Sequence, residues 1–163
     1  MTPVSHALLP VFLGQRWIPK KERVPAPGFV ALVALSGALP DILSPHLSLD
    51  ARYEASSHSL WALLGFILVV VMLAWRLPRI FTPTISILCV TAYAGHIACD
   101  AITGGVAFFF PFGGVQGGNY LPYWLWITSD GLLLIYLYLV YRWRPLRRKI
   151  TEGRQAVGPA QYP

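Results

Sequence analysis

The sequence predicts an all-α integral membrane protein, a bundle of four to five transmembrane helices joined by short loops. Hydrophobic residues make up 55% of the 163-residue chain and charged residues only 12%, whereas a soluble domain carries about a quarter charged residues. The mean hydropathy is +0.54, so the chain lacks the side chains that would hydrate a surface. The basic residues stand in short clusters between apolar runs, which is the pattern that orients membrane helices.

Five apolar segments supply the predicted helices. The clearest is 59–77, which has no charge before Arg76 and, at about 1.5 Å per residue, can cross a hydrocarbon core of roughly 30 Å. The first segment is barely long enough to cross, so it either spans the membrane or lies in the interface. The last segment carries Tyr and Trp at both ends, as interfacial anchors do. The predicted segments are 4–14, 28–42, 59–77, 84–102 and 123–143.

The basic clusters predict one orientation for the chain. The five segments form a single predicted domain, residues 1–150, and a disordered cytoplasmic tail follows at 151–163. Clusters at 16–23, 76–79 and 142–154 alternate with loops of little or no positive charge, which places the C-terminus in the cytoplasm of a multi-pass plasma (inner) membrane protein. The net charge of +6 does not indicate nucleic-acid binding, because no basic and aromatic face or Gly-rich phosphate loop accompanies it.

Ionisable side chains from different predicted helices gather at one depth, near the outer membrane face. An ionisable group inside a spanning helix is costly and usually marks function. Asp41 ends one predicted helix, His58 begins the next, and Asp130 lies about 10 Å along the last. The first segment adds a further residue at this level if it crosses. The convergent residues are His6, Asp41, His58, His96, Asp100 and Asp130.

Spacing within this group indicates a metal site. His96 and Asp100 are four residues apart, so on a helix they project from one face, one turn apart, and both can direct lone pairs at one ion. Asp41 and His58 can complete a set of two nitrogens and two oxygens, which suits zinc and, by ligand type, manganese or iron. The alternative is that His96 and Asp100 bond to each other and stabilise helix packing.

Other polar and aromatic residues have two interpretations each. Asp130 is a proton acceptor, or a polar group that supports a ligand or the packing. Cys99 is a soft ligand or a small buried hydrophobe, for which the second interpretation is favoured, and His46 is expected to be solvated. The charge-free loop 104–122 is either an interfacial aromatic belt or a hydrophobic lip over the site. The residues of this predicted lip are Phe109, Phe110 and Phe112.

Four motifs in the first two thirds of the chain carry a family resemblance. In order they are VSHALLP, LSGALPD, SSHSLW and GHIACDAITGGVAFFFPF. Together they resemble small bacterial and archaeal membrane-bound, metal-dependent hydrolases once catalogued as a domain of unknown function, over about residues 3–112. That family is similar in motif order to the zinc-dependent phospholipases C and related single-strand nucleases.

The resemblance implies roles for individual residues. It implies that Asp41, His58, His96 and Asp100 bind one metal ion, and that His6 helps to bind a second ion bridged by Asp100. The chain has no histidine after His96, so the later ligands of the phospholipases are missing and a third ion is not expected. A further departure is the sequence Tyr-Glu-Ala at residues 53–55, where the membrane family often has His-Arg-Gly.

These observations predict a metal-dependent hydrolase that acts at the outer face of the membrane and binds one or two divalent ions. A metal ion lowers the pKa of a bound water toward neutrality, and Asp130 or Asp100 can accept the proton. The resemblance implies a phosphodiester substrate, in a lipid headgroup or another small molecule near the bilayer. The alternatives are a non-catalytic membrane protein whose metal or polar cluster holds the helices together, and a small transporter subunit.

Overall fold

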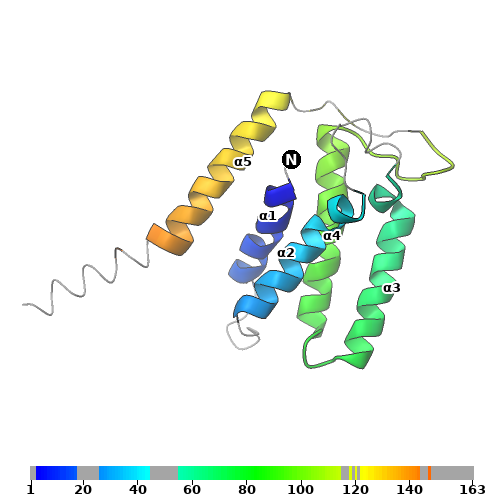
Figure 1. Ribbon diagram of the computed structural model, residues 1–163, viewed down its shortest axis with the longest axis horizontal. Helices are drawn as coiled ribbons and strands as arrows, with labels where there is room; N and C mark the ends of the chain where they lie inside the picture. The colour runs from blue at the N-terminus through cyan, green and yellow to red at the C-terminus, as the bar shows by residue number, and fades with distance from the viewer. Residues whose placement is uncertain are drawn as a thin grey trace, which may run out of the picture.

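In the computed structural model the regular secondary structure of the described residues is entirely helical (Figure 1). The structure describes residues 3–17, 26–44, 55–114, 118, 120, 122–143 and 147. No β-strand occurs in these ranges, so the all-α prediction is confirmed for them. The helices are α1 (Pro3–Trp17), α2 (Ala26–Leu43), α3 (Leu60–Arg76), α4 (Pro83–Thr103) and α5 (Tyr123–Tyr138), with the short turns η3 (Ser56–His58) before α3 and η4 (Leu139–Trp143) after α5.

Local sequence signals fix where α3 and α4 begin. The hydroxyl of Ser59 accepts a hydrogen bond from the backbone N–H of Ala62, and Thr82 caps α4 in the same way, followed by Pro83 at the first helical position. Ser and Thr at these positions satisfy backbone donors that have no partner within the helix. Proline is favoured at the first helical position because its missing N–H is not needed there.

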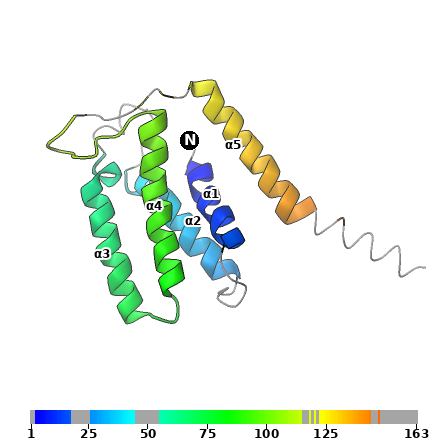
Figure 2. The ribbon, with the colours of Figure 1, turned by 180° about the vertical axis from the view of Figure 1, so that it is seen from behind.

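Helix α4 lies at the centre of the bundle. It packs against α1, α2 and α3, and Figures 1 and 2 show it between α3 on one side and α1 and α2 on the other. Val33 of α2 and Ile85, Cys89 and Ala92 of α4 form the centre of one buried cluster. Helix α5 leans away from the other four helices in both views and contacts α1.

Gly37 allows α1 and α2 to approach each other closely. A Cβ atom at this position would overlap the backbone carbonyl oxygen of His6 and would lie 3.3 Å from the ring of Pro10. Only glycine leaves room for backbone contact of this kind. The glycine of the LSGALPD motif therefore brings the first helix against the second at the level of His6.

The surface of the bundle is rich in large apolar side chains. On α3, Leu68 is 70% exposed and Trp75 is 76% exposed, and soluble monomers rarely expose contiguous apolar patches of this kind. By length and composition, α4 is the one helix among the described residues that is long and apolar enough to cross a membrane. The apolar helices Gly28–Leu43, Leu60–Arg76 and Ile127–Tyr138 are shorter. A bundle of four to five crossings therefore stays a prediction.

Candidate metal centre

Two histidines and two aspartates from three segments meet at one end of the bundle. Asp41 lies in the last turn of α2, His58 ends η3, and His96 and Asp100 stand one turn apart on α4. One potential ligand atom from each of the four lies within 4.8 Å of the others, so together they can hold a metal ion. The structure thus brings together the four residues that the sequence singled out as the first metal site.

The distances among these four side chains fit a small ion at their centre. The Nε2 atoms of His58 and His96 are 3.2 Å apart. Asp41 Oδ1 lies 3.4 Å from each of these nitrogens, and Asp100 Oδ2 lies 3.4 Å from His58 and 3.1 Å from His96. In a tetrahedral zinc site with ligands at about 2.0–2.2 Å, neighbouring ligand atoms are about 3.3–3.6 Å apart. The observed separations are close to this range without rearrangement of the backbone.

The hydrogen bonds on the far side of each imidazole ring determine its tautomer. His96 Nδ1 lies 2.7 Å from the backbone oxygen of Gly37, and because a carbonyl can only accept, this nitrogen carries the proton. His58 Nδ1 lies 3.1 Å from the hydroxyl of Ser57, which donates its own proton to the carbonyl of Pro40 at 2.7 Å. The serine oxygen must therefore accept from His58. Both Nε2 lone pairs consequently face the centre of the cluster.

Two lone pairs that face each other at 3.2 Å do not form a hydrogen bond, and two carboxylates beside them add negative charge. The arrangement needs positive charge at its centre, either a proton on one Nε2 or a metal ion. Metal-binding histidines typically donate the other ring N–H to a carbonyl, carboxylate or water. His96 and His58 both have such a partner, so their orientation is the one that metal binding requires.

His6 lies beside this cluster rather than within it. Its Nε2 is 3.2 Å from Asp100 Oδ1, and its ring stacks on that of His96 with centroids 3.8 Å apart. The two oxygens of Asp100 are thus divided, with Oδ1 directed to His6 and Oδ2 to the four-residue cluster. His6 is 4% exposed, and it fixes the orientation of a carboxylate that the cluster uses.

Access to the cluster is restricted. The side chains of His58, His96 and Asp100 have no exposed surface, whereas that of Asp41 is 11% exposed. Among the four, Asp41 is therefore the one that a molecule outside the bundle can reach. It lies at the end of α2, two residues before Leu43, where the helix meets an open groove.

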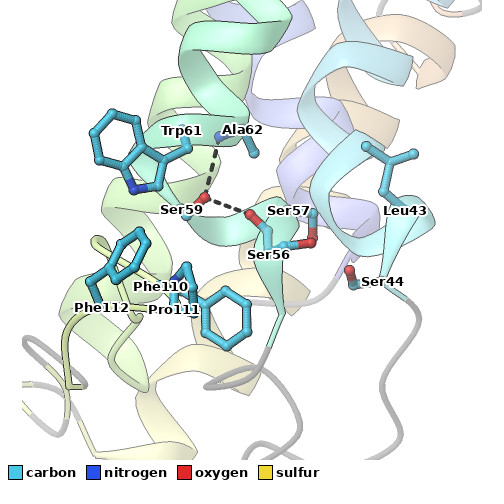
Figure 3. Close-up of a pocket in the computed structure, with 10 residues that line it drawn as sticks. All are labelled: Leu43, Ser44, Ser56, Ser57, Ser59, Trp61, Ala62, Phe110, Pro111 and Phe112. Carbon is cyan, nitrogen blue, oxygen red and sulfur yellow. Dashed lines mark hydrogen bonds between the residues drawn. The ribbon is translucent and has the colours of Figure 1, made fainter.

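This groove has a volume of about 800 Å³ (Figure 3). Leu43 forms one side, Trp61 and Phe112 lie on the other, and serines of η3 lie between them. The backbone N–H of Leu60 donates to the carbonyl of Phe108 at 2.9 Å, which holds the loop after α4 against the start of α3. The groove is lined by Leu43, Ser44, Ser56, Ser57, Ser59, Trp61, Ala62, Phe110, Pro111 and Phe112.

Two of the three residues of the predicted lip, Phe110 and Phe112, line this groove. Phe109 is 50% exposed and belongs to the same loop. Asp130 is buried on α5 but is not a member of the four-residue cluster, and neither is Cys99. His46 and residues 53 and 54 lie outside the described residues.

Sequence reasoning overlooked the residues that hold the ligands in place. Gly37 and Pro40 belong to the LSGALPD motif and Ser57 to SSHSLW, yet those motifs indicated only Asp41 and His58. Their roles depend on backbone carbonyls and on one hydroxyl whose directions are set by the fold. The signal that could have indicated Ser57 is the repeated occurrence of serine next to histidine, because serine hydroxyls commonly bond to neighbouring groups.

The helical fold, the apolar surface and this cluster define a helical membrane protein with a candidate metal centre. Over residues 1–157 the chain matches the family described as YdjM inner membrane protein. The chain therefore belongs to the YdjM inner membrane protein family, which agrees with the predicted plasma membrane location. No curated protein and no solved structure matches the chain.

Proposed function

We propose that the chain is a membrane-embedded, metal-dependent hydrolase whose metal ion is bound by Asp41, His58, His96 and Asp100. The observation that carries the proposal is the meeting of four ligand atoms from three separate segments at 3.1–3.4 Å in five pairs. A divalent ion held by these four residues would supply a nucleophilic hydroxide near neutral pH if it also bound one water as a fifth ligand. The family name supports the membrane location and names no activity.

Zinc is the ion that we propose first. Imidazole nitrogens and carboxylate oxygens are both zinc ligands, and the five separations suit an ion that lies about 2.0–2.2 Å from each atom. Manganese or iron in an octahedral site has six ligand positions, and any four of them include at least one opposite pair. Two of these ligand atoms would therefore have to lie about 4.2–4.4 Å apart. Only the pair formed by the two carboxylate oxygens can supply it, since the other five pairs lie at 3.1–3.4 Å.

The chain itself would orient the ligands and move the proton. Gly37 and Ser57 hold the two imidazole rings, and burial of three of the four ligands excludes bulk water from most of the site. Asp100, or Asp130 if α5 closes on the bundle, would accept the proton of the attacking water. His6 would either orient Asp100, as it does here, or bind a second ion bridged by that carboxylate.

The substrate that we propose is a phosphodiester in a lipid headgroup or in another molecule close to the bilayer. The resemblance to the membrane-bound hydrolases supports the reaction class, and membership of an inner membrane family supports the setting. The alternation of basic clusters supports a multi-pass chain with a cytoplasmic C-terminus and the site near the outer face. Fusions of a reporter to the two ends of α4 would test this orientation.

A structural metal is the second candidate function, and two observations favour it. The four ligands connect α2, η3 and α4, so a bound ion would hold these elements together without any turnover. Buried ligands with no exposed surface, such as His58 and Asp100, are also typical of closed structural sites. The two candidates share the metal and differ in chemistry.

Elemental analysis of the detergent-purified protein tests both candidates. The wild type is expected to contain one or two divalent ions per chain, and a His96→Ala/Asp100→Ala variant none. Cys99→Ala is the matched control, because Cys99 lies on the same helix but outside the cluster. A wild type that stays free of metal after reloading would exclude both candidates. Metal that raises thermal stability while no phosphodiester or phospholipid is hydrolysed would favour the structural metal.

A further inference from the structure

The groove at the end of the bundle has an apolar rim and a hydroxyl-bearing floor. Leu43, Trp61 and Phe112 contribute hydrocarbon and aromatic surface, and none of the lining residues is charged. The hydroxyls of Ser57 and Ser59 already donate to backbone carbonyls, whereas Ser56 is exposed in the floor. The groove thus suits a molecule that combines an apolar chain with neutral hydrogen-bonding groups.

The rim of the groove is continuous with the apolar face of α3. Trp61 lines the groove and is itself 55% exposed, and along the helix it is followed by the exposed residues Leu64, Leu68 and Met72. In a protein of an inner membrane family we expect hydrocarbon chains to cover this face. A lipid can therefore enter the groove sideways without leaving an apolar environment.

The floor of the groove adjoins the candidate metal centre. Ser57 lines the groove and accepts a hydrogen bond from His58, while Leu43 and Ser44 follow closely after Asp41. Asp41 is also the ligand whose side chain is partly exposed. A molecule whose apolar chain rests on Trp61 and Phe112 would hence place its polar part beside the cluster.

We propose that this groove binds one glycerolipid from the bilayer, with an acyl chain against Trp61 and Phe112 and the glycerol ester region over Ser56. Aromatic side chains suit this position, because they combine an apolar body with tolerance of the membrane interface. The bilayer is the source of the occupant that we propose, since the groove opens onto the exposed apolar face of α3. The orientation of the polar part toward the metal centre rests on the proposed function, whereas lipid binding itself does not.

Native mass spectrometry of the full chain in mild detergent, titrated with palmitoyl-oleoyl phosphatidylethanolamine, tests the proposal. In Ser56→Trp the indole fills the floor of the groove, and Leu68→Trp is the matched control, because it adds the same indole to the exposed face of α3. The wild type and Leu68→Trp are each expected to bind one lipid. Ser56→Trp is expected to bind lipid at least about tenfold more weakly, because the lipid loses buried hydrocarbon contact.

A second variant keeps the test decisive if Ser56→Trp does not fold. Phe112 is 87% exposed, so Phe112→Ala should leave the fold intact and still weaken lipid binding several-fold. Equal lipid binding by the wild type and both variants would overturn the proposal, as would a wild type that binds no lipid. The metal content of the same samples distinguishes the lipid-binding proposal from the proposed hydrolase. If the protein contains no metal and still binds lipid in the groove, the lipid-binding proposal stands and the proposed hydrolase is excluded.

Discussion

Removal of one hydroxyl, that of Ser57, tests whether the imidazole of His58 is held in place for a metal ion. The hydroxyl accepts from His58 Nδ1 at 3.1 Å and donates to the carbonyl of Pro40 at 2.7 Å. In Ser57→Ala the ring loses the partner that fixes its tautomer and direction. Loss of such an outer partner typically costs about 10–100-fold in metal affinity, which corresponds to about 1.4–2.8 kcal/mol. This equals the contribution of one or two hydrogen bonds.

The assay is a competition titration of the purified protein with zinc and a chelator of known affinity. Ser59→Ala is the matched control, because Ser59 is the other neighbour of His58 but its hydroxyl donates to the carbonyl of Ser56 and accepts from the N–H of Ala62 as the cap of α3. It should lower the free energy of unfolding by about 0.5–2 kcal/mol and leave zinc affinity unchanged. Ser57→Thr, which keeps a hydroxyl, should recover most of the affinity. Equal zinc affinity in Ser57→Ala and wild type would refute the reasoning.

Three further substitutions, the first with a matched control, have expected outcomes. Gly37→Ala should lower the unfolding free energy by at least about 1–3 kcal/mol, because the new methyl group meets the backbone of His6. The control is Gly95→Ala, which has open space around the new methyl group and should be neutral or stabilising. Thermal unfolding of both variants measures the difference. Tyr93→Phe removes a 2.7 Å bond to the carbonyl of Ser57 and should destabilise by about 1 kcal/mol. In elemental analysis His6→Ala should lower the metal content only if a second ion binds. Unchanged metal content would mean that His6 acts only through its hydrogen bond to Asp100.

The helical elements could be predicted from composition and apolar runs alone. The predicted segment 84–102 corresponds to α4 (Pro83–Thr103), and 59–77 contains α3 (Leu60–Arg76). Agreement is close here because Ser59 and Thr82 cap their helices, so the residue at which each helix begins is determined by the local sequence. The number of membrane crossings is a different matter. It depends on the surrounding lipid, and in the part of the chain that the structure describes, length and composition mark α4 alone as long and apolar enough.

The meeting of these four side chains could also be predicted, for a simple physical reason. An ionisable residue in an apolar helix needs a partner, so His96 and Asp100 had to meet groups from other helices at the same depth. The sequence could not show how the rings are oriented, because Gly37 acts through its carbonyl and its missing side chain. Those contacts exist only once α1, α2 and α4 have packed together.

A structural ion and a catalytic ion would depend on the same packing of α1, α2 and α4. Gly37 brings α1 against α2 and at the same time orients His96, so one residue serves both the fold and the site. A purely structural ion would need no approach route, yet the partly exposed ligand, Asp41, lies next to the groove. If a lipid that occupies this groove also protects the metal from chelation, the two sites adjoin one another and the catalytic proposal is strengthened. If chelation proceeds equally fast with and without lipid, the groove and the metal centre work independently, and the ion is better explained as a structural one.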